Sequence, residues 1–264
     1  MWRFVALFLA LLAGMAAAAW YYRSSPPAPE RVMTRSDDRW LDDLQSRSPK
    51  DADAAAVALE QRGTAAVPLI RRVLDDASAP EARRRAALKA CEILGPRAID
   101  ALPEVTALLQ DPAYTAEAAL ALSFMGSPAV EPLREAVHAQ EPAVRREALR
   151  SLGKLRERAS IDPQVVLPLL LDALDDSDAS VRTVSVTYLG IVRDDPQRAV
   201  PGLIRALDDA DPEVRRAACV ALGAYGAHAA SAVPALQKAT RDPDEDVQRE
   251  AGRALVTIAE ARKQ

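Results

Sequence analysis

The stretch AVPGLIRALDDADPEVRRAACVALGAYG, residues 199–226, predicts two helices joined by a short acidic turn. Apolar side chains recur at helical spacing along its first half, at Val200, Leu203, Ile204 and Leu207. That spacing places them on one stripe of a helix, with polar residues on the opposite side. Pro201 stands near the expected start, where the N–H groups of the first turn have no helical acceptor and a missing donor costs nothing.

The second half of the stretch begins with a helix-start signal. Asp211 is a favourable N-cap and Pro212 a favourable first residue. The following helix is expected to bury a second apolar set, Val214, Ala217, Ala218, Ala221 and Leu222. Gly223 predicts its end, because glycine readily adopts a left-handed cap. Neither helix can bury its stripe alone, so each needs a neighbour.

The same landmarks recur along the chain, which indicates an internal repeat. The proline landmark recurs 29 to 36 residues apart, at Pro68, Pro103, Pro132, Pro168, Pro201 and Pro234. Val-Arg pairs follow about one helix later, at Val144–Arg145, Val181–Arg182 and Val214–Arg215. Apolar-Gly endings close the copies at Gly95, Gly126, Gly153, Gly190 and Gly223. Short helices that each begin near a proline also explain the nineteen prolines of the composition.

On these landmarks the chain resembles HEAT-repeat proteins, and in particular the short HEAT-like repeats of phycobilin lyase subunits. The resemblance covers six helix pairs from about Thr64 to Ala261 and is most specific at 166–189 and 200–223. It implies an all-α fold, a right-handed α-solenoid whose second helices line the concave face. It also implies a structural ladder between copies, formed by Asp175, Asp208, Arg145, Arg182 and Arg215. The first two copies depart from that ladder pattern.

The first 23 residues differ from the rest of the chain. After Arg3 they run for nineteen residues without a charge, as FVALFLALLAGMAAAAWYY. A transmembrane signal anchor needs about 20 apolar residues, with aromatic residues at the interface. A cleavable signal peptide would use Ala17 to Ala19 as its cleavage site. Both remain open, and the aromatic residues after that site favour the anchor.

Two features of the sequence give opposite indications of the side of the membrane on which the repeat domain lies. Arginines just beyond the apolar run favour a cytoplasmic repeat domain, because positive charge is retained inside. The very short tail before the run favours export. We therefore expect a single-pass protein of a bacterial inner membrane, held through residues 4–22, with its repeats on the extracytoplasmic side. Cleavage would instead give a secreted protein.

The sequence divides into four segments. Residues 1–23 are the anchor or signal peptide, and 24–36 are a Pro-rich linker. Residues 37–63 predict a pair of capping helices, since the terminal repeats of a solenoid are atypical. In that pair, Trp40 is expected to pack over the open end of the stack. Residues 64–264 are the repeat domain.

The sequence predicts no catalytic, cofactor-binding or metal-binding residues. His138 and His228 each lack a second ligand at helical spacing, so neither indicates a metal site. Cys91 and Cys219 lie in distant copies and are expected to be buried and unpaired. The acidic clusters recur just before helix starts, where turn formation and capping explain them.

The second helices also carry recurring polar side chains that could contact a protein partner. The candidates are Arg146, Arg150, Thr183, Thr187, Arg216 and Arg249. Nucleic acid is not the predicted ligand, because the chain has a formal net charge of −4 and only 4% aromatic residues. The first hypothesis is a non-catalytic scaffold, membrane-anchored, that binds a protein of unknown identity. The alternative, by resemblance, is an enzyme or enzyme subunit similar to bilin lyases.

Overall fold

The structure, a computed structural model, describes residues 38–158 and 161–263. In these residues the secondary structure is entirely helical, with turns between the helices. The chain divides into two units, Met1–Arg39 and Trp40–Gln264, and the helical stack belongs to the second. The predicted anchor or signal segment and the linker lie outside the described residues.

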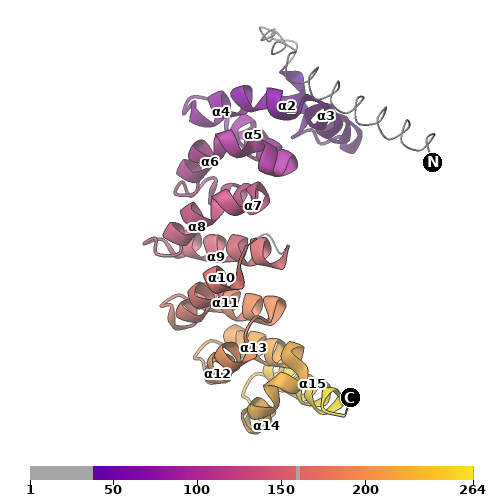
Figure 1. The fold of residues 1–264 in the computed structure, drawn as a ribbon, viewed down its shortest axis with the longest axis vertical. Coiled ribbons are helices and arrows are strands. Elements are labelled where there is room, and N and C mark those ends of the chain that lie inside the picture. Colours follow the sequence, from indigo (N-terminus) through magenta and orange to yellow (C-terminus); the bar gives the residue numbers. More distant parts are fainter. Residues whose placement is uncertain (1–37, 159–160, 264) are drawn as a thin grey trace, which may run out of the picture. The chain divides into compact units, whose positions relative to one another are not determined.

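Six helix pairs follow one another along the stack, as the repeat landmarks predict (Figure 1). The first helices are α4 (Val67–Asp75), α6 (Leu102–Leu108), α8 (Val130–Ala136), α10 (Pro163–Asp172), α12 (Pro196–Ala206) and α14 (Val233–Ala239). The second helices are α5 (Glu81–Leu94), α7 (Thr115–Met125), α9 (Pro142–Glu157), α11 (Ala179–Val192), α13 (Pro212–Tyr225) and α15 (Glu245–Ala261). Short 3₁₀ turns join or extend several of them: η1 (Gly63–Ala66), η2 (Gly95–Ala101), η3 (Ser127–Ala129), η4 (Ala173–Asp175) and η5 (Gly226–Ala232).

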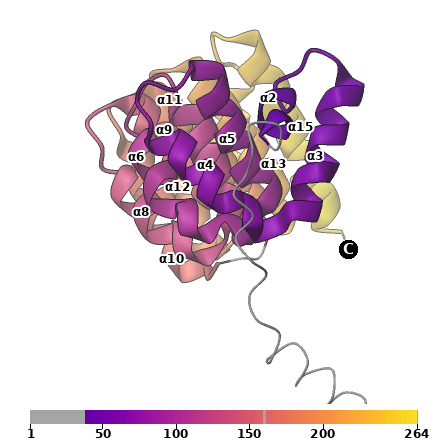
Figure 2. The same cartoon turned by 90° about the horizontal axis from the view of Figure 1, so that it is seen from above.

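Two layers make up the stack. From α5 to α15 each second helix packs on the next, whereas successive first helices make fewer direct contacts with one another. Viewed along the stack, the second helices α9 and α11 lie above the first helices α8, α10 and α12, and α13 and α15 lie to their right (Figure 2). The resemblance to HEAT repeats assigns this more closely packed layer to the concave side of the stack. We use "concave face" for the exposed sides of α9, α11, α13 and α15 that point away from the first helices.

The helix ends correct one prediction. Gly223 does not cap α13; the helix continues to Tyr225, and Gly226 is the cap, with φ of +55°. Gly95 and Gly126 are caps of the same kind. Gly153, Gly190 and Gly223 instead lie inside their helices at the contact with the next repeat. The apolar-Gly landmark thus marks two different positions, which local sequence alone does not separate.

The interior glycines allow the second helices to approach closely. A Cβ added at Gly190 would lie 2.8 Å from both the Cα and the Cβ of Ala221 in the next second helix. Since one of those atoms belongs to the backbone, the two helices would have to move apart. Gly252 on α15 is the contrasting case, because a Cβ there meets nothing within 4 Å.

This contrast predicts opposite effects of the same substitution. Gly190→Ala should lower the free energy of unfolding by about 1–3 kcal/mol, as overpacking does. Gly252→Ala should raise it by about 0.5–1 kcal/mol, because alanine loses less conformational entropy in a helix. Urea unfolding of both variants measures the difference. Equal effects would show that the close approach at Gly190 is unimportant.

One helix start also differs from prediction. Asp195 caps α12 by accepting the backbone N–H of Arg198, and the helix begins at Pro196. Pro201 therefore lies inside α12, as Pro168 lies inside α10. Asp211 and Pro212 hold their predicted places at the start of α13, where the Asp211 carboxylate accepts the N–H of Glu213 at 2.8 Å.

The N-terminal end of the stack carries the short helix α2 (Arg39–Asp43) and α3 (Pro49–Arg62). Trp40 is buried there, with 5% of its surface exposed. The Arg62 guanidinium carbon lies 5.9 Å from the centre of the Trp40 ring, at cation–π distance. Helix α3 packs on α5, so these helices cover the first repeat.

One stretch of the described residues, Pro212–Ala239, is long and apolar enough to cross a membrane. It consists of α13, η5 and α14, and 44% of its most apolar window is buried inside the fold. Core helices of soluble proteins pass the same test, so this stretch is weak evidence for a membrane span.

Candidate functional site: the concave face and its arginine ladder

Three bidentate ion pairs join the third to the sixth repeat. Arg145 donates from Nε and Nη2 to the two carboxylate oxygens of Asp176, at 2.8 and 2.7 Å. Arg182 contacts Asp209 at 2.8 and 2.7 Å in the same way. Arg215 contacts Asp242 at 2.8 Å through both nitrogens. We call these three pairs the arginine ladder.

The aspartates of the ladder are not the predicted ones. Asp175 and Asp208 each precede the residue that the arginine contacts. Their side chains are 79% and 69% exposed, and they form exposed pairs with Arg205 and Lys238 of the following first helix. The backbone explains the choice, because Asp209 accepts the N–H of Asp211 and is thereby turned inward.

Each ladder arginine also binds the turn of its own repeat. Arg182 Nη1 donates to the carbonyl oxygens of Asp176 and Ser177, and Arg215 Nη1 to those of Asp209 and Ala210. Gln248 takes this position in the last repeat and donates only to the Asp242 carbonyl, at 2.6 Å. One arginine therefore satisfies the carbonyls of one turn and the carboxylate of the next.

The ladder is incomplete in the first repeats, as the sequence predicts. Arg84 stacks over the ring of Tyr114, 4.8 Å from its centre, and the ion pair to the second repeat is formed by Arg85, which contacts Glu117 at 2.9 Å. Thr115 stands at the ladder position of α7 and donates only to the Asp111 carbonyl of its own turn. In the turn of the third repeat, Ala139 occupies the position of the ladder aspartate, as its carbonyl contact with Arg145 shows. Within the described residues, no ion pair links the second repeat to the third.

The ladder lowers the pKa of its carboxyl groups. The Arg145 hydrogen bond is the main cause for Asp176, and the Arg215 hydrogen bond for Asp242. For Asp209, burial raises the pKa most strongly, but Arg182 and the Asp211 N–H together outweigh it, and the pKa is lowered. A carboxyl group with a lowered folded-state pKa stabilises the fold above its unfolded pKa and loses that effect as the pH falls.

Substitution of the adjacent Asp208 and Asp209 tests which of the two belongs to the arginine ladder. Asp209→Ala should lower the free energy of unfolding by about 1–3 kcal/mol at pH 7, because Arg182 loses a charged partner in a poorly exposed site. Asp208→Ala should cost at most about 1 kcal/mol, since its pair is exposed. The Asp209 effect should shrink as the pH falls below about 4, where carboxyl groups become protonated. Chemical unfolding at several pH values measures the free energy of unfolding of both variants. A larger decrease in that free energy for Asp208→Ala than for Asp209→Ala would contradict the assignment of Asp209 to the ladder.

The predicted contact arginines of α9 form a cluster around one carboxylate. Glu147 is buried, with 6% of its surface exposed. It accepts from Arg146 at 3.1 Å and from Arg150 at 3.0 Å. Two guanidinium groups therefore share one carboxylate, so this part of the concave face carries excess positive charge.

The other predicted contact residues lie on the neighbouring helices in the same row. Thr183 and Thr187 of α11 donate to backbone carbonyls one turn back. Arg216 of α13 pairs with Glu213, and Arg249 of α15 with Asp246 and Glu250, all within the same helix. The structure thus brings the six residues together on one face, where none of them contributes to the ladder.

Sequence reasoning missed two apolar residues of this face. Ile191 and Val220 are 41% and 49% exposed, on α11 and α13. Val220 follows Arg216 by four residues, so helical spacing places it on the same side. That spacing was the available signal, but an isolated valine in an alanine-rich helix is usually counted as core.

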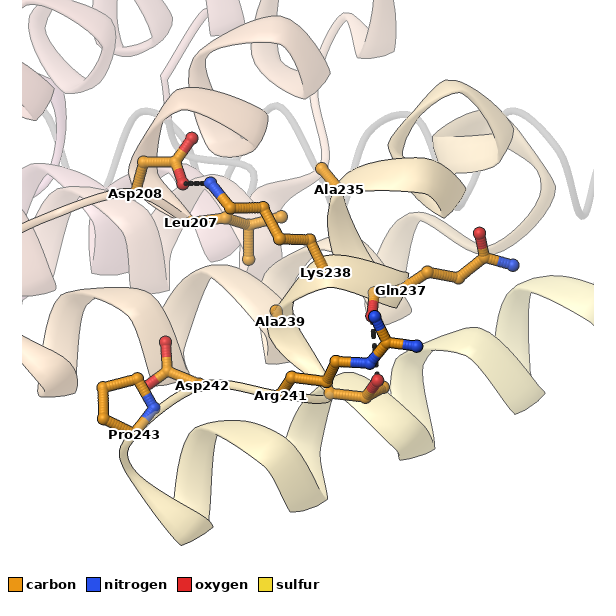
Figure 3. Close-up of a pocket in the computed structure, with 10 residues that line it drawn as sticks. Leu207, Asp208, Ala235, Gln237, Lys238, Ala239, Arg241, Asp242 and Pro243 are labelled. Atoms are coloured by element: carbon orange, nitrogen blue, oxygen red, sulfur yellow. Dashed lines mark hydrogen bonds and ion pairs between the residues drawn. The ribbon is translucent and has the colours of Figure 1, made fainter.

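The remaining candidates are the two cysteines and one open cleft. Cys91 and Cys219 are buried and unpaired, and burial raises the pKa of each thiol to about 12. Among the described residues there is no cluster of ligand types that could hold a metal ion. A cavity of about 640 Å³ opens between the turns of the last two repeats, lined by Leu207, Lys238, Arg241 and their neighbours. Figure 3 shows Lys238 reaching from this cavity to Asp208. It is an open cleft on the first-helix side.

Comparison with known proteins agrees with this architecture. The sequence matches the family of HEAT repeats over residues 102–186 and 167–256. These two matches span more than half of the chain, which therefore belongs to the HEAT-repeat family. The first helix pair lies outside them. No curated protein matches the sequence.

Solved structures show the same fold at low identity. Kap121p is 16% identical, with a TM-score of 0.63, over 86% of this chain and 29% of that one. Kap95p, in a structure with RanGDP, is 17% identical, with a TM-score of 0.54, over 86% and 35%. One chain of the complex of CpcE and CpcF of phycocyanin lyase from Nostoc is 24% identical over 59% of this chain and 98% of that one, with a TM-score of 0.49, which is too low to support a conclusion. These likenesses concern the fold alone.

Proposed function

We propose that this protein is a membrane-anchored, non-catalytic scaffold that binds a protein partner through its concave face. The observation that carries the proposal is one row of exposed side chains across four consecutive second helices, from Arg150 on α9 to Arg249 on α15. A repeat stack offers a long continuous surface of this kind, and its contacts are spread over several repeats.

The rigidity of that row supports a binding role. The arginine ladder joins α9, α11, α13 and α15 through their turns, so the row is held in one register before a partner arrives. A preorganised surface binds more tightly, because less conformational entropy is lost on association. The structure of Kap95p with RanGDP shows that a stack of this fold can hold a protein partner.

The apolar sequence near the N-terminus supports a role near a membrane. The uncharged run from Phe4 to Tyr22 is long enough to span a bilayer. A tethered concave face would meet its partner at a raised effective concentration. The proposal places the protein in a bacterial inner membrane with its repeats on the extracytoplasmic side.

Charge reversal tests the concave face. Arg150→Glu combined with Arg216→Glu should reduce recovery of the native partner in a pull-down at least about tenfold, which corresponds to the loss of one strong contact. The matched control is Arg134→Glu with Arg205→Glu, two exposed arginines of the first helices α8 and α12. Circular dichroism verifies that both variants fold. Loss of the partner in the control alone would reject the concave face as the binding site.

A reporter fusion tests the location. A C-terminal reporter that is active only in the periplasm should be active and should fractionate with the membrane. Activity in the soluble fraction would show that the segment is cleaved. An inactive reporter on a stable fusion protein would place the repeats in the cytoplasm and contradict the proposed side.

A further inference from the structure

The concave face has an apolar centre. Four large hydrophobic side chains are strongly exposed among the described residues, at Val57, Ile191, Val220 and Val256. Ile191 and Val220 lie on the neighbouring helices α11 and α13 and face away from the first helices. Thr187, the exposed residue one turn before Ile191, has its hydroxyl bound to a backbone carbonyl and carries no charge. The middle of the row therefore offers apolar contact.

Basic side chains flank this centre on both sides. On α9, Arg150 shares the Glu147 carboxylate with Arg146, and the side-chain ammonium group of Lys154, one turn further, has no hydrogen bond or ion pair among the described residues. On α15, Arg253 is 68% exposed and shares Glu250 with Arg249. Donor groups thus remain for a further carboxylate at each end. The α9 end carries the larger excess of positive charge, because two guanidinium groups there share one carboxylate.

The distance between the basic residues of α9 and those of α15 sets the length of a segment that could contact both. Packed helices lie about 8–10 Å apart, so the three steps from α9 to α15 span about 24–30 Å. An extended chain rises about 3.3 Å per residue, so about eight residues cover that distance. Two apolar side chains between the ends would fall over α11 and α13.

From this arrangement we propose that the concave face binds an extended segment of a protein partner with acidic residues about eight positions apart and apolar residues between them. The inference rests on the proposed function and adds the chemistry of the partner. Nucleic acid fits the face less well, because its phosphates need a continuous basic track and stacking needs aromatic rings. Ile191, Thr187 and Val220 interrupt any such track.

A displayed library of random 16-residue peptides, selected on the full chain in detergent micelles, tests the inference. Enriched peptides should carry Asp or Glu on both sides of apolar residues, at the spacing derived above. Their binding, measured by fluorescence anisotropy, should weaken at least tenfold with Val220→Asp and with Arg150→Glu combined with Lys154→Glu. Val256→Asp is the matched control, since Val256 is 58% exposed on α15 at the end of the stack. It should leave the dissociation constant within twofold.

The outcomes separate this inference from the proposed function. Enriched peptides that are basic or lack the apolar centre, but still depend on Arg150 and Val220, would overturn the partner chemistry and leave concave binding intact. Peptides that are insensitive to the Val220 and Arg150 variants would overturn the inference. If partner recovery in the pull-down were also unchanged by the concave-face variants, the proposed function would be rejected as well. A selection without enrichment would likewise overturn the inference.

Discussion

The direct packing of each second helix on the next is the interaction on which the rest of this structure depends. A single helix pair cannot cover its own apolar stripe, so every repeat needs its neighbours. Gly190 and Gly223 remove the side chains that would hold successive backbones apart. The arginine ladder lies beside this contact and fixes the turns of one repeat to those of the next. Close packing on one layer also places the exposed residues of α9 to α15 in one row.

The repeated helix pairs could be predicted because the period of the apolar pattern reports how each helix packs. Their exact ends could not. Gly95 and Gly223 both follow a leucine, yet one caps a helix and the other lies within a contact, and only the neighbouring repeat decides which. The ladder shows the same limit. Asp208 and Asp209 are chemically alike, and the hydrogen bond from the Asp211 N–H selects the second.

The sequence predicted the charged residues of the candidate site but not its exposed apolar residues. An arginine on the outer side of a helix can be found from spacing. The pairing of Arg146 and Arg150 with one buried carboxylate depends on side-chain geometry, which spacing does not give. The exposure of Val220 depends on what the fold leaves uncovered, and the first helices cover only the opposite side of α13. In the alanine-rich sequence around Val220, its spacing from Arg216 is the one sign of that exposure.

The break in the ladder between the second and third repeats has a mechanical consequence. Neighbour interactions in a repeat array set how far a local opening spreads before it stops. At the Thr115 position the second and third turns share no ion pair, while Ser151 still bonds across the helices to the Ala119 carbonyl at 2.7 Å. Arg158 also donates to the Ser123 carbonyl across this joint at 2.7 Å and stacks over the Phe124 ring. A local opening that starts in the first two repeats therefore crosses this joint by breaking helix packing, hydrogen bonds and a cation–π contact, whereas at each further step it must also break an ion pair of the arginine ladder.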